Sequence, residues 1–171
     1  MLLSAAEKAL QSATLTDASE RHDLLVAVTM SALAVEAFAN AVGHLLFPDW
    51  EEFESAPTRA KLFLIGRELR LDINKSKVPW QQVFELGKFR NEIVHAKPER
   101  VINTDYVTEA ERESRRFEIP HSKLEKKLSL KSATRSFGAC KAAFDLVAAR
   151  MPEEVRFEVV ANGWSTTHRP E

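Results

Sequence analysis

The residues best suited to chemistry lie in one segment, Arg90-Asn91-Glu92-Ile93-Val94-His95. In a helix each residue turns by roughly 100°, so Asn91 and His95 lie about one turn apart and Arg90 lies beside Asn91. A guanidinium grips phosphate oxygens, an imidazole transfers protons near neutral pH, and an amide orients either group. Arg90, Asn91 and His95 therefore form a candidate catalytic set for cleaving RNA without a metal ion.

Each member of this set has a role in such a reaction. His95 would deprotonate the ribose 2′-hydroxyl or protonate the leaving oxygen. Arg90 would stabilise the charge on the pentacoordinate phosphorus and Asn91 would hold the geometry, leaving 2′,3′-cyclic phosphate ends. The alternative is structural, because the helix dipole favours Arg and His near a helix C-terminus whatever the function.

A polar stripe interrupts the apolar run from Leu24 to Phe47. Glu36, Asn40 and His44 are spaced four apart and share one face of a helix. A carboxylate in mid-span is costly in lipid, so the run predicts a helix inside a bundle and not a membrane span. Glu36 needs a donor, for which Arg90 is the obvious candidate. A network of Glu36, Asn40 and Arg90 would either support catalysis or fix the register of two helices.

Apolar spacing and prolines predict the remaining elements. Helices are expected over residues 2–11, 19–47, 57–71, 79–96 and 132–151. In the third of these, Leu62, Ile65 and Leu69 share the apolar face, and the other faces carry mainly polar side chains: Lys61, Arg67, Glu68 and Arg70. The charged stretch 99–128 is expected to be an irregular excursion, and 155–160 to be a short strand or an extended arm. The fold prediction is thus one all-α domain over residues 1–171: an up-and-down bundle of four to five helices, with core helices at about 2–96 and 130–151 and a tail over 152–171.

Composition narrows the partners and the compartment. Lys and Arg number 24 against 25 Asp and Glu, so no overall field would draw the chain to RNA and any contact must come from a local patch. Lys97 and Arg100 are the candidate RNA-binding residues, although an ordinary solvated face explains them slightly better. Cys140 is the only cysteine, which excludes an internal disulfide and favours a cytoplasmic location. We expect no metal or cofactor, since no second histidine stands at ligand spacing from His44.

The motif resembles that of the HEPN superfamily, whose signature is Arg, four to six residues, then His near the end of a late helix. Arg90 and His95 have the shortest of these spacings, with Asn91 as the preferred polar follower. Related bundles often carry a Glu and an Asn four residues apart on the facing helix, as Glu36 and Asn40 are here. The resemblance covers about half of the chain.

The resemblance implies a homodimer in which both motifs build one composite cleft. It implies a metal-independent endoribonuclease of the toxin, antiphage or RNA-processing type, whose partners would include RNA and a cognate antitoxin or regulatory protein. Toxins paired with an adenylylating nucleotidyltransferase usually have Tyr two residues after the His, where this chain has Lys97, so that subtype is disfavoured. Some members of the superfamily only bind, and a non-catalytic interaction module therefore stays open as the alternative. A third alternative is that the excursion regulates access to the motif.

Overall fold

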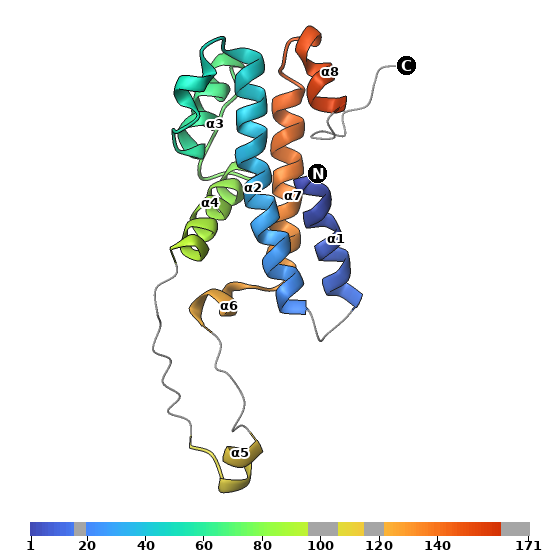
Figure 1. Cartoon of the computed structure of the whole chain (residues 1–171), viewed down its shortest axis with the longest axis vertical. Helices are drawn as coiled ribbons and strands as arrows, with labels where there is room; N and C mark the ends of the chain where they lie inside the picture. The colour runs from blue at the N-terminus through green and yellow to red at the C-terminus, as the bar shows by residue number, and fades with distance from the viewer. Residues whose placement is uncertain (16–19, 96–105, 115–121, 162–171) are drawn as a thin grey trace.

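The computed structural model of the chain describes residues 1–15, 20–95, 106–114 and 122–161. Every regular element within these ranges is helical (Figure 1). The α-helices are α1 (Leu2–Leu15), α2 (Glu20–Leu46), α3 (Thr58–Glu68), α4 (Trp80–Val94), α5 (Glu109–Ser114), α6 (Lys123–Lys127), α7 (Leu130–Ala148) and α8 (Glu153–Ala161), and a 3-10 helix, η1, covers Trp50–Phe53. The predicted all-α class is confirmed, but the described ranges hold eight α-helices where four to five were expected.

Four long helices form the body of the molecule. In Figure 1, α2 and α7 run side by side in the same direction, and α1 and α4 flank them with the opposite direction. Helix α3 packs on α2, and α8 packs near the end of α7. Helix α4, which carries the Arg90 motif, therefore contacts both central helices and α3.

Helix α2 is the centre of the core. Leu24, Phe38 and Val42 on this helix are at most 1% exposed, and the Phe38 ring stacks on Phe144 of α7 with ring centroids 4.0 Å apart. By length and composition α2 could also cross a membrane, but 50% of its most apolar window is buried in the protein. This burial is typical of the core helix predicted from the polar stripe.

The turn after α2 determines where α3 lies. Trp50 is fully buried against α2, and a Cβ at Gly43 would meet its ring at 2.0 Å. Glycine is therefore required at position 43, because any side chain would push the indole away from the helix. The close packing of Trp50 on α2 directs the chain back toward α4 and brings α3 beside both helices.

The prediction of an extended segment at 155–160 is wrong, because these residues belong to α8. Val155 and Val159 lie one helical turn apart and pack against the core, with Val159 only 1% exposed. Pro152 precedes the helix, and Glu153 and Glu154 occupy its first turn, where the helix dipole favours acidic side chains. The alternation of apolar Val155, Phe157 and Val159 with charged residues resembles a strand, whereas these start signals indicate a helix.

The prediction of an irregular excursion is also wrong in part. Helices α5 and α6 lie within it, while residues 99–105 and 115–121 of that stretch lie outside the described residues. The backbone N–H of Glu125 donates to the Ser122 side chain at the start of α6, and the Glu125 carboxylate accepts from the Ser122 N–H. This capping box has the sequence pattern Ser-x-x-Glu, which is a recognisable start signal.

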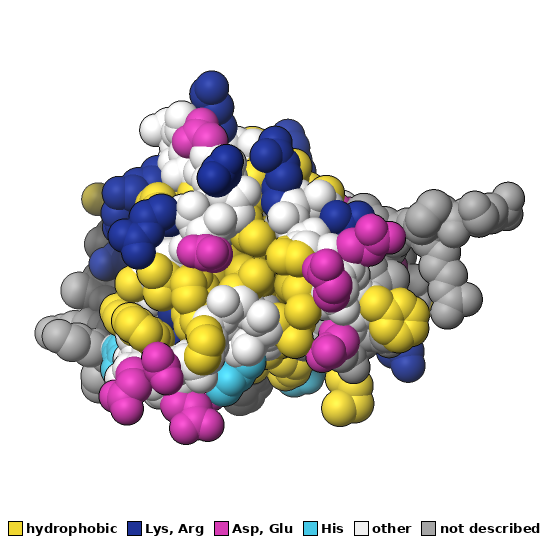
Figure 2. Space-filling model, turned by 90° about the horizontal axis from the view of Figure 1, so that it is seen from above, with side chains coloured by type: hydrophobic (Ala, Val, Ile, Leu, Met, Phe, Trp, Pro, Cys, Tyr) yellow, Lys and Arg dark blue, Asp and Glu magenta, His cyan; other side chains and the backbone are white. Residues whose placement is uncertain are grey.

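Charges of both signs border the upper end of the bundle. Figure 2 looks down on this end and shows hydrophobic side chains near its centre, acidic side chains mainly at the lower left and on the right, and Lys and Arg side chains mainly at the upper left. Neither sign covers the whole end, in keeping with the formal net charge of −1. Binding of a phosphate group would therefore depend on a local group of cations and not on the overall charge.

Candidate functional site

Helix α4 faces inward with its apolar side and carries the motif at its C-terminal end. Val83 and Leu86 are at most 3% exposed and hold α4 against the core. Arg90 follows Leu86 by one turn, and its side chain is 29% exposed. Asn91 and His95 are exposed. The motif thus begins at the edge of the core and ends in solvent.

The guanidinium of Arg90 forms an ion pair with the carboxylate of Glu36. The Arg90 Nη2 donates to Glu36 Oε2, which joins α4 to α2 as expected from the sequence. Both side chains are about one-third exposed, so solvent weakens the attraction without removing it. The contact engages Nη2 of the guanidinium, and within the described residues this side chain makes no other hydrogen bond.

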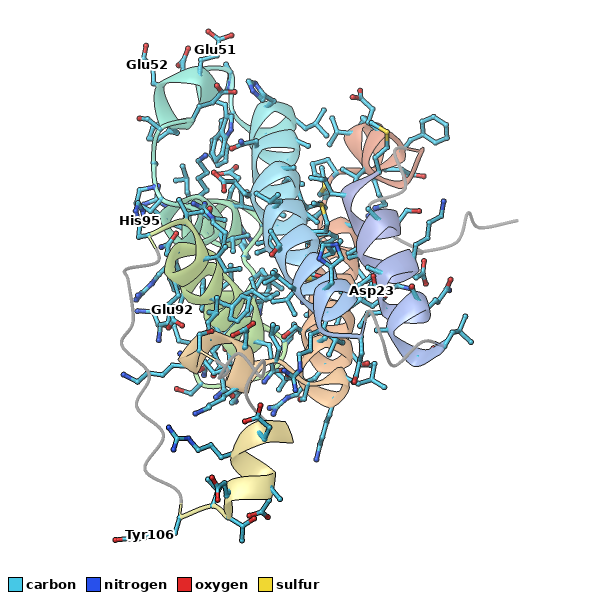
Figure 3. All side chains as sticks on the ribbon, turned by 60° about the horizontal axis from the view of Figure 1, so that its bottom comes forward. Asp23, Glu51, Glu52, Glu92, His95 and Tyr106 are labelled. Carbon is cyan, nitrogen blue, oxygen red and sulfur yellow. The ribbon has the colours of Figure 1, made fainter. Side chains whose placement is uncertain are left out.

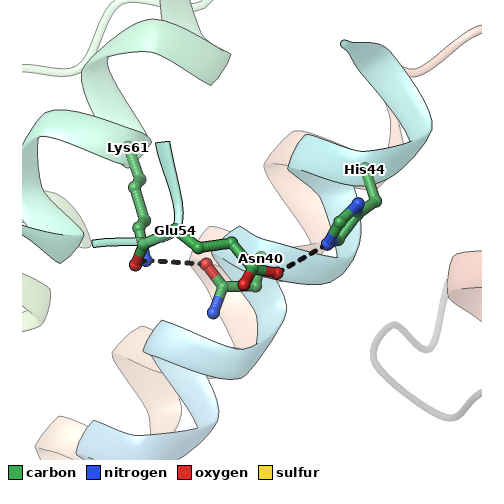
Figure 4. Close-up of polar contacts among 4 residues, drawn as sticks. All are labelled: Asn40, His44, Glu54 and Lys61. Atoms are coloured by element: carbon green, nitrogen blue, oxygen red, sulfur yellow. Dashed lines mark hydrogen bonds and ion pairs between the residues drawn. The ribbon is translucent and has the colours of Figure 1, made fainter. Parts of the chain in front are cut away.

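Asn40 does not join this pair, which corrects the predicted network. Its Oδ1 accepts a hydrogen bond of 2.8 Å from Lys61 Nζ of α3, and the same ammonium donates to the backbone carbonyl of Glu54 at 2.7 Å (Figure 4). Lys61 is only 2% exposed. Asn40 therefore helps to hold a buried lysine and does not position Arg90.

Sequence reasoning missed the burial of Lys61 and placed it on an outward face of the third helix. The available signal was its spacing, because Lys61 lies one turn before Ile65 on the apolar stripe of that helix. A lysine can follow such a stripe when its ammonium finds acceptors at the end of an apolar stem.

His44, the third member of the polar stripe, lies near the surface. Its Nε2 is 2.8 Å from Glu54 Oε1, and the two side chains are 47% and 51% exposed. Among the described residues, no group of three or more His, Cys, Asp and Glu side chains is arranged to hold a metal ion. The stripe thus contacts three different segments: Glu36 meets α4, Asn40 meets α3, and His44 meets the turn that follows η1.

Arg90 and Asn91 share a cavity of about 320 Å³ between α2, α3 and α4. Two further cations, Arg59 of α3 and Lys88 of α4, contribute to its lining. His95 does not line it. The structure therefore brings Arg90 and Asn91 together with additional positive charge, and it leaves His95 apart from them on the same helix.

His95 is the residue that ends α4. Its backbone N–H donates to the carbonyl of Asn91 at 3.0 Å, which closes the last turn. Its side chain forms no hydrogen bond within the described residues, and Figure 3 shows it at the outer edge of the bundle. The imidazole can therefore exchange protons with a molecule that docks at this end of α4. Lys97 and Arg100, the candidate RNA-binding residues, lie outside the described residues.

Cys140 takes no part in this site. It is fully buried in α7, where its Sγ donates a weak hydrogen bond to the carbonyl of Ser31 at 3.8 Å. Burial raises the pKa of the Cys140 thiol to about 12, because the thiolate would be desolvated. The thiol stays protonated at neutral pH and is not a nucleophile.

The comparisons with known proteins add no relative. No family model matches the sequence, and neither the curated proteins nor the solved structures contain a significant match. The function is therefore argued from the geometry of the chain itself.

Proposed function

We propose that this protein is a HEPN-like dimer that binds RNA at the C-terminal end of α4 and cleaves it without a metal ion. The observation that carries the proposal is the position of Arg90 and Asn91 in a cavity with two further cations, with His95 exposed one turn later on the same helix. A phosphate-binding guanidinium and a proton-transferring imidazole are the two groups that such a cleavage needs.

In the proposed reaction, the remaining N–H donors of Arg90 bind the phosphoryl oxygens of the scissile group. Glu36 holds the guanidinium by its Nη2 and so positions it without blocking the other donors. His95 acts as the general base or acid at the 2′-hydroxyl or the leaving oxygen, and Asn91 orients the phosphate. Lys97 and Arg100 contribute further positive charge that binds the RNA backbone. We place the protein in the cytoplasm, because its single cysteine favours a reducing compartment.

The separation of Arg90 from His95 favours a site built by two chains. Within one chain His95 lies outside the cavity that contains Arg90. A two-fold dimer through α4 would bring His95 of one protomer to the cavity of the other, and the reverse contact would follow from symmetry. The proposal therefore depends on dimerisation and not on a rearrangement within one chain.

The test is cleavage of a mixed RNA pool in EDTA by the wild-type protein and by Arg90→Ala and His95→Ala. Both variants are expected to lose at least 100-fold in rate, the order expected for loss of one acid, base or charge-stabilising group. Products of the wild-type protein are expected to have 2′,3′-cyclic phosphate ends. Arg67→Ala and His22→Ala are the matched controls, because both residues are exposed on other helices.

Mixing the two inactive variants tests the composite site. After random exchange of protomers, heterodimers with one intact site are expected to restore about a quarter of the wild-type activity, because half of the dimers are mixed and each mixed dimer has one of two sites complete. A mixture that stays inactive, although wild-type dimers cleave RNA, would contradict a site shared between chains.

The Glu36–Arg90 ion pair also favours a second candidate function, a non-catalytic interaction module. In that case the pair only fastens α4 to α2, and the exposed end of α4 binds a partner protein or a second copy. Wild-type protein that is folded and dimeric but neither binds nor cleaves RNA would support this alternative.

A further inference from the structure

The cavity between α2, α3 and α4 has the composition of a small-molecule site. Its lining combines apolar side chains with polar ones, and its positive side chains all come from α3 and α4. Of the described residues that line it, none is Asp or Glu. The apolar part of the lining includes Val35, Leu62, Val83 and Phe84. Apolar walls with a few convergent polar groups are the usual form of a ligand pocket.

Arg59 is held in place at this cavity by aromatic rings. Its guanidinium carbon lies 5.8 Å from the ring centroids of both Phe63 and Phe84, and these rings stack on each other with centroids 5.6 Å apart. Stacking on an aromatic face restricts the arginine without using its N–H donors. Arg59 is therefore oriented in advance and can still bind an anion.

Other groups around the cavity add positive potential. Lys88 and Arg90 lie on α4, and the N-terminal turn of α3 contributes Pro57 and Thr58 to the lining. Pro57 provides no side-chain cap for α3, so the first amides of that helix keep their partial positive charge. The cations come from two different helices and surround one space, which distinguishes this group from an ordinary charged surface.

Gly87 keeps the cavity open. This residue lies in the middle of α4 and lines the cavity, and a Cβ added to it would meet no atom within 4 Å. Glycine inside a helix lowers its stability relative to any ordinary residue. Packing does not require glycine here, and a larger side chain at position 87 would extend into the open space of the cavity.

We propose that this cavity binds a small organic anion, with its apolar body against Val35, Leu62 and Phe84 and its carboxylate or phosphate between Arg59, Lys88 and Arg90. The ligand occupies one protomer, and the proposal does not rest on ribonuclease activity. Because the ligand shares Arg90 with the proposed RNA site, ligand binding and RNA binding would compete. The apolar body distinguishes this ligand from a bare inorganic anion, which would gain nothing from the walls.

The test uses 2-naphthoate as the probe, with 2-naphthamide as its neutral analogue and acetate as the anion without an apolar body. Binding is followed by calorimetry and by the amide resonances of Gly87 and Asn91. Wild-type protein is expected to bind one equivalent of 2-naphthoate at least tenfold more tightly than either control compound. Absence of saturable binding of 2-naphthoate, or equal affinity for the amide, would overturn the proposal.

Two leucine substitutions locate the bound probe. Gly87→Leu fills the cavity and is expected to weaken 2-naphthoate binding at least tenfold, while Gly138→Leu is expected to leave it unchanged. Gly138 is the matched control because it is also inside a long helix, α7, and has the same open space around its Cβ position. Both variants are expected to melt no lower than the wild type, since each replaces a helical glycine. Undiminished binding by Gly87→Leu would place the probe elsewhere and overturn the proposal.

Charge substitutions separate the anion from the apolar body. Lys88→Gln and Arg59→Gln are each expected to weaken 2-naphthoate binding by three- to tenfold and to leave the weak binding of 2-naphthamide unchanged. An equal loss for both compounds would show that the cations do not bind the carboxylate, and it would contradict the proposed orientation.

Discussion

Two members of the polar stripe on α2, Asn40 and Glu36, each contact a cation from a neighbouring helix, and the two contacts lie in different environments. Around Asn40 a lysine from α3 is buried to 2% exposure and donates to two oxygens of the protein. Around Glu36 an arginine from α4 remains 29% exposed beside a cavity, and within the described residues its side chain forms a hydrogen bond only with Glu36. A buried cation whose hydrogen bonds are made within its own protein stabilises the fold. A partly exposed cation with further N–H donors beside a cavity is available to a ligand.

The largest expected effect concerns the buried contact between Lys61 and Asn40. Lys61→Ala leaves the Asn40 Oδ1 and the Glu54 carbonyl without their donor and removes the packing of the lysine stem. The free energy of unfolding is expected to fall by about 3 kcal/mol in urea denaturation. Lys131→Ala, on an exposed position of α7, is the control and is expected to change stability by less than about 0.5 kcal/mol. A comparable change in the free energy of unfolding of the two variants would show that the buried Lys61 contact does not stabilise the fold more than an exposed lysine does.

The next effect extends the comparison to the apolar side of α2, where Cys140 contacts the carbonyl of Ser31. The thiol has a pKa of about 12 in the folded chain against 9.0 as its ordinary value. Between these values the unfolded chain loses the proton and the folded chain keeps it, so this contribution to stability is complete below pH 9 and is lost as pH rises. The wild type is expected to lose about 1.4 kcal/mol per pH unit above pH 9 relative to Cys140→Ala. Parallel stability curves for the two proteins from pH 8 to 10.5 would contradict this expectation.

The smallest effect on stability is expected for the partly exposed contact between Glu36 and Arg90. A double-mutant cycle with Glu36→Gln and Arg90→Ala is expected to give a coupling energy of about 1 kcal/mol, because both side chains are partly solvated. Arg90→Ala is expected to affect RNA binding and cleavage more than Lys61→Ala does. The order of the two contacts is therefore reversed between stability and RNA binding. A coupling energy near that of the Lys61 change would indicate that Arg90 is mainly structural.

Most of the helical framework was predictable from the sequence because apolar spacing reports burial directly. Leu62 and Ile65 of α3 and Leu69, which directly follows this helix, are buried as predicted. The Glu36–Arg90 pair followed from the need of a partly buried carboxylate for a donor. Lys61 was missed because its charge was taken as a sign of exposure. The helix α8 was missed because apolar and charged residues alternate over 155–159, as they do in a strand.

The cavity could not have been predicted from the sequence, for a physical reason. It depends on how far α2, α3 and α4 stand apart, and that distance is determined by packing between residues remote in the chain. The one local sign was Gly87, a glycine without a turn to explain it. The separation of His95 from Arg90 was hidden as well, because helical spacing relates positions along α4 but not the surroundings of each side chain.

The anchoring of Glu54 has a consequence for the speed of binding. Its carbonyl is held by Lys61 and its carboxylate by His44, only three residues before Pro57 on the wall of the cavity. The segment that enters α3 is thereby tied to α2 directly through His44 and indirectly through Lys61, which also donates to Asn40, and these contacts hold this wall close to α2. A ligand must enter a preformed space, so its observed association rate is expected to rise linearly with concentration, without the plateau that a slow opening step would impose.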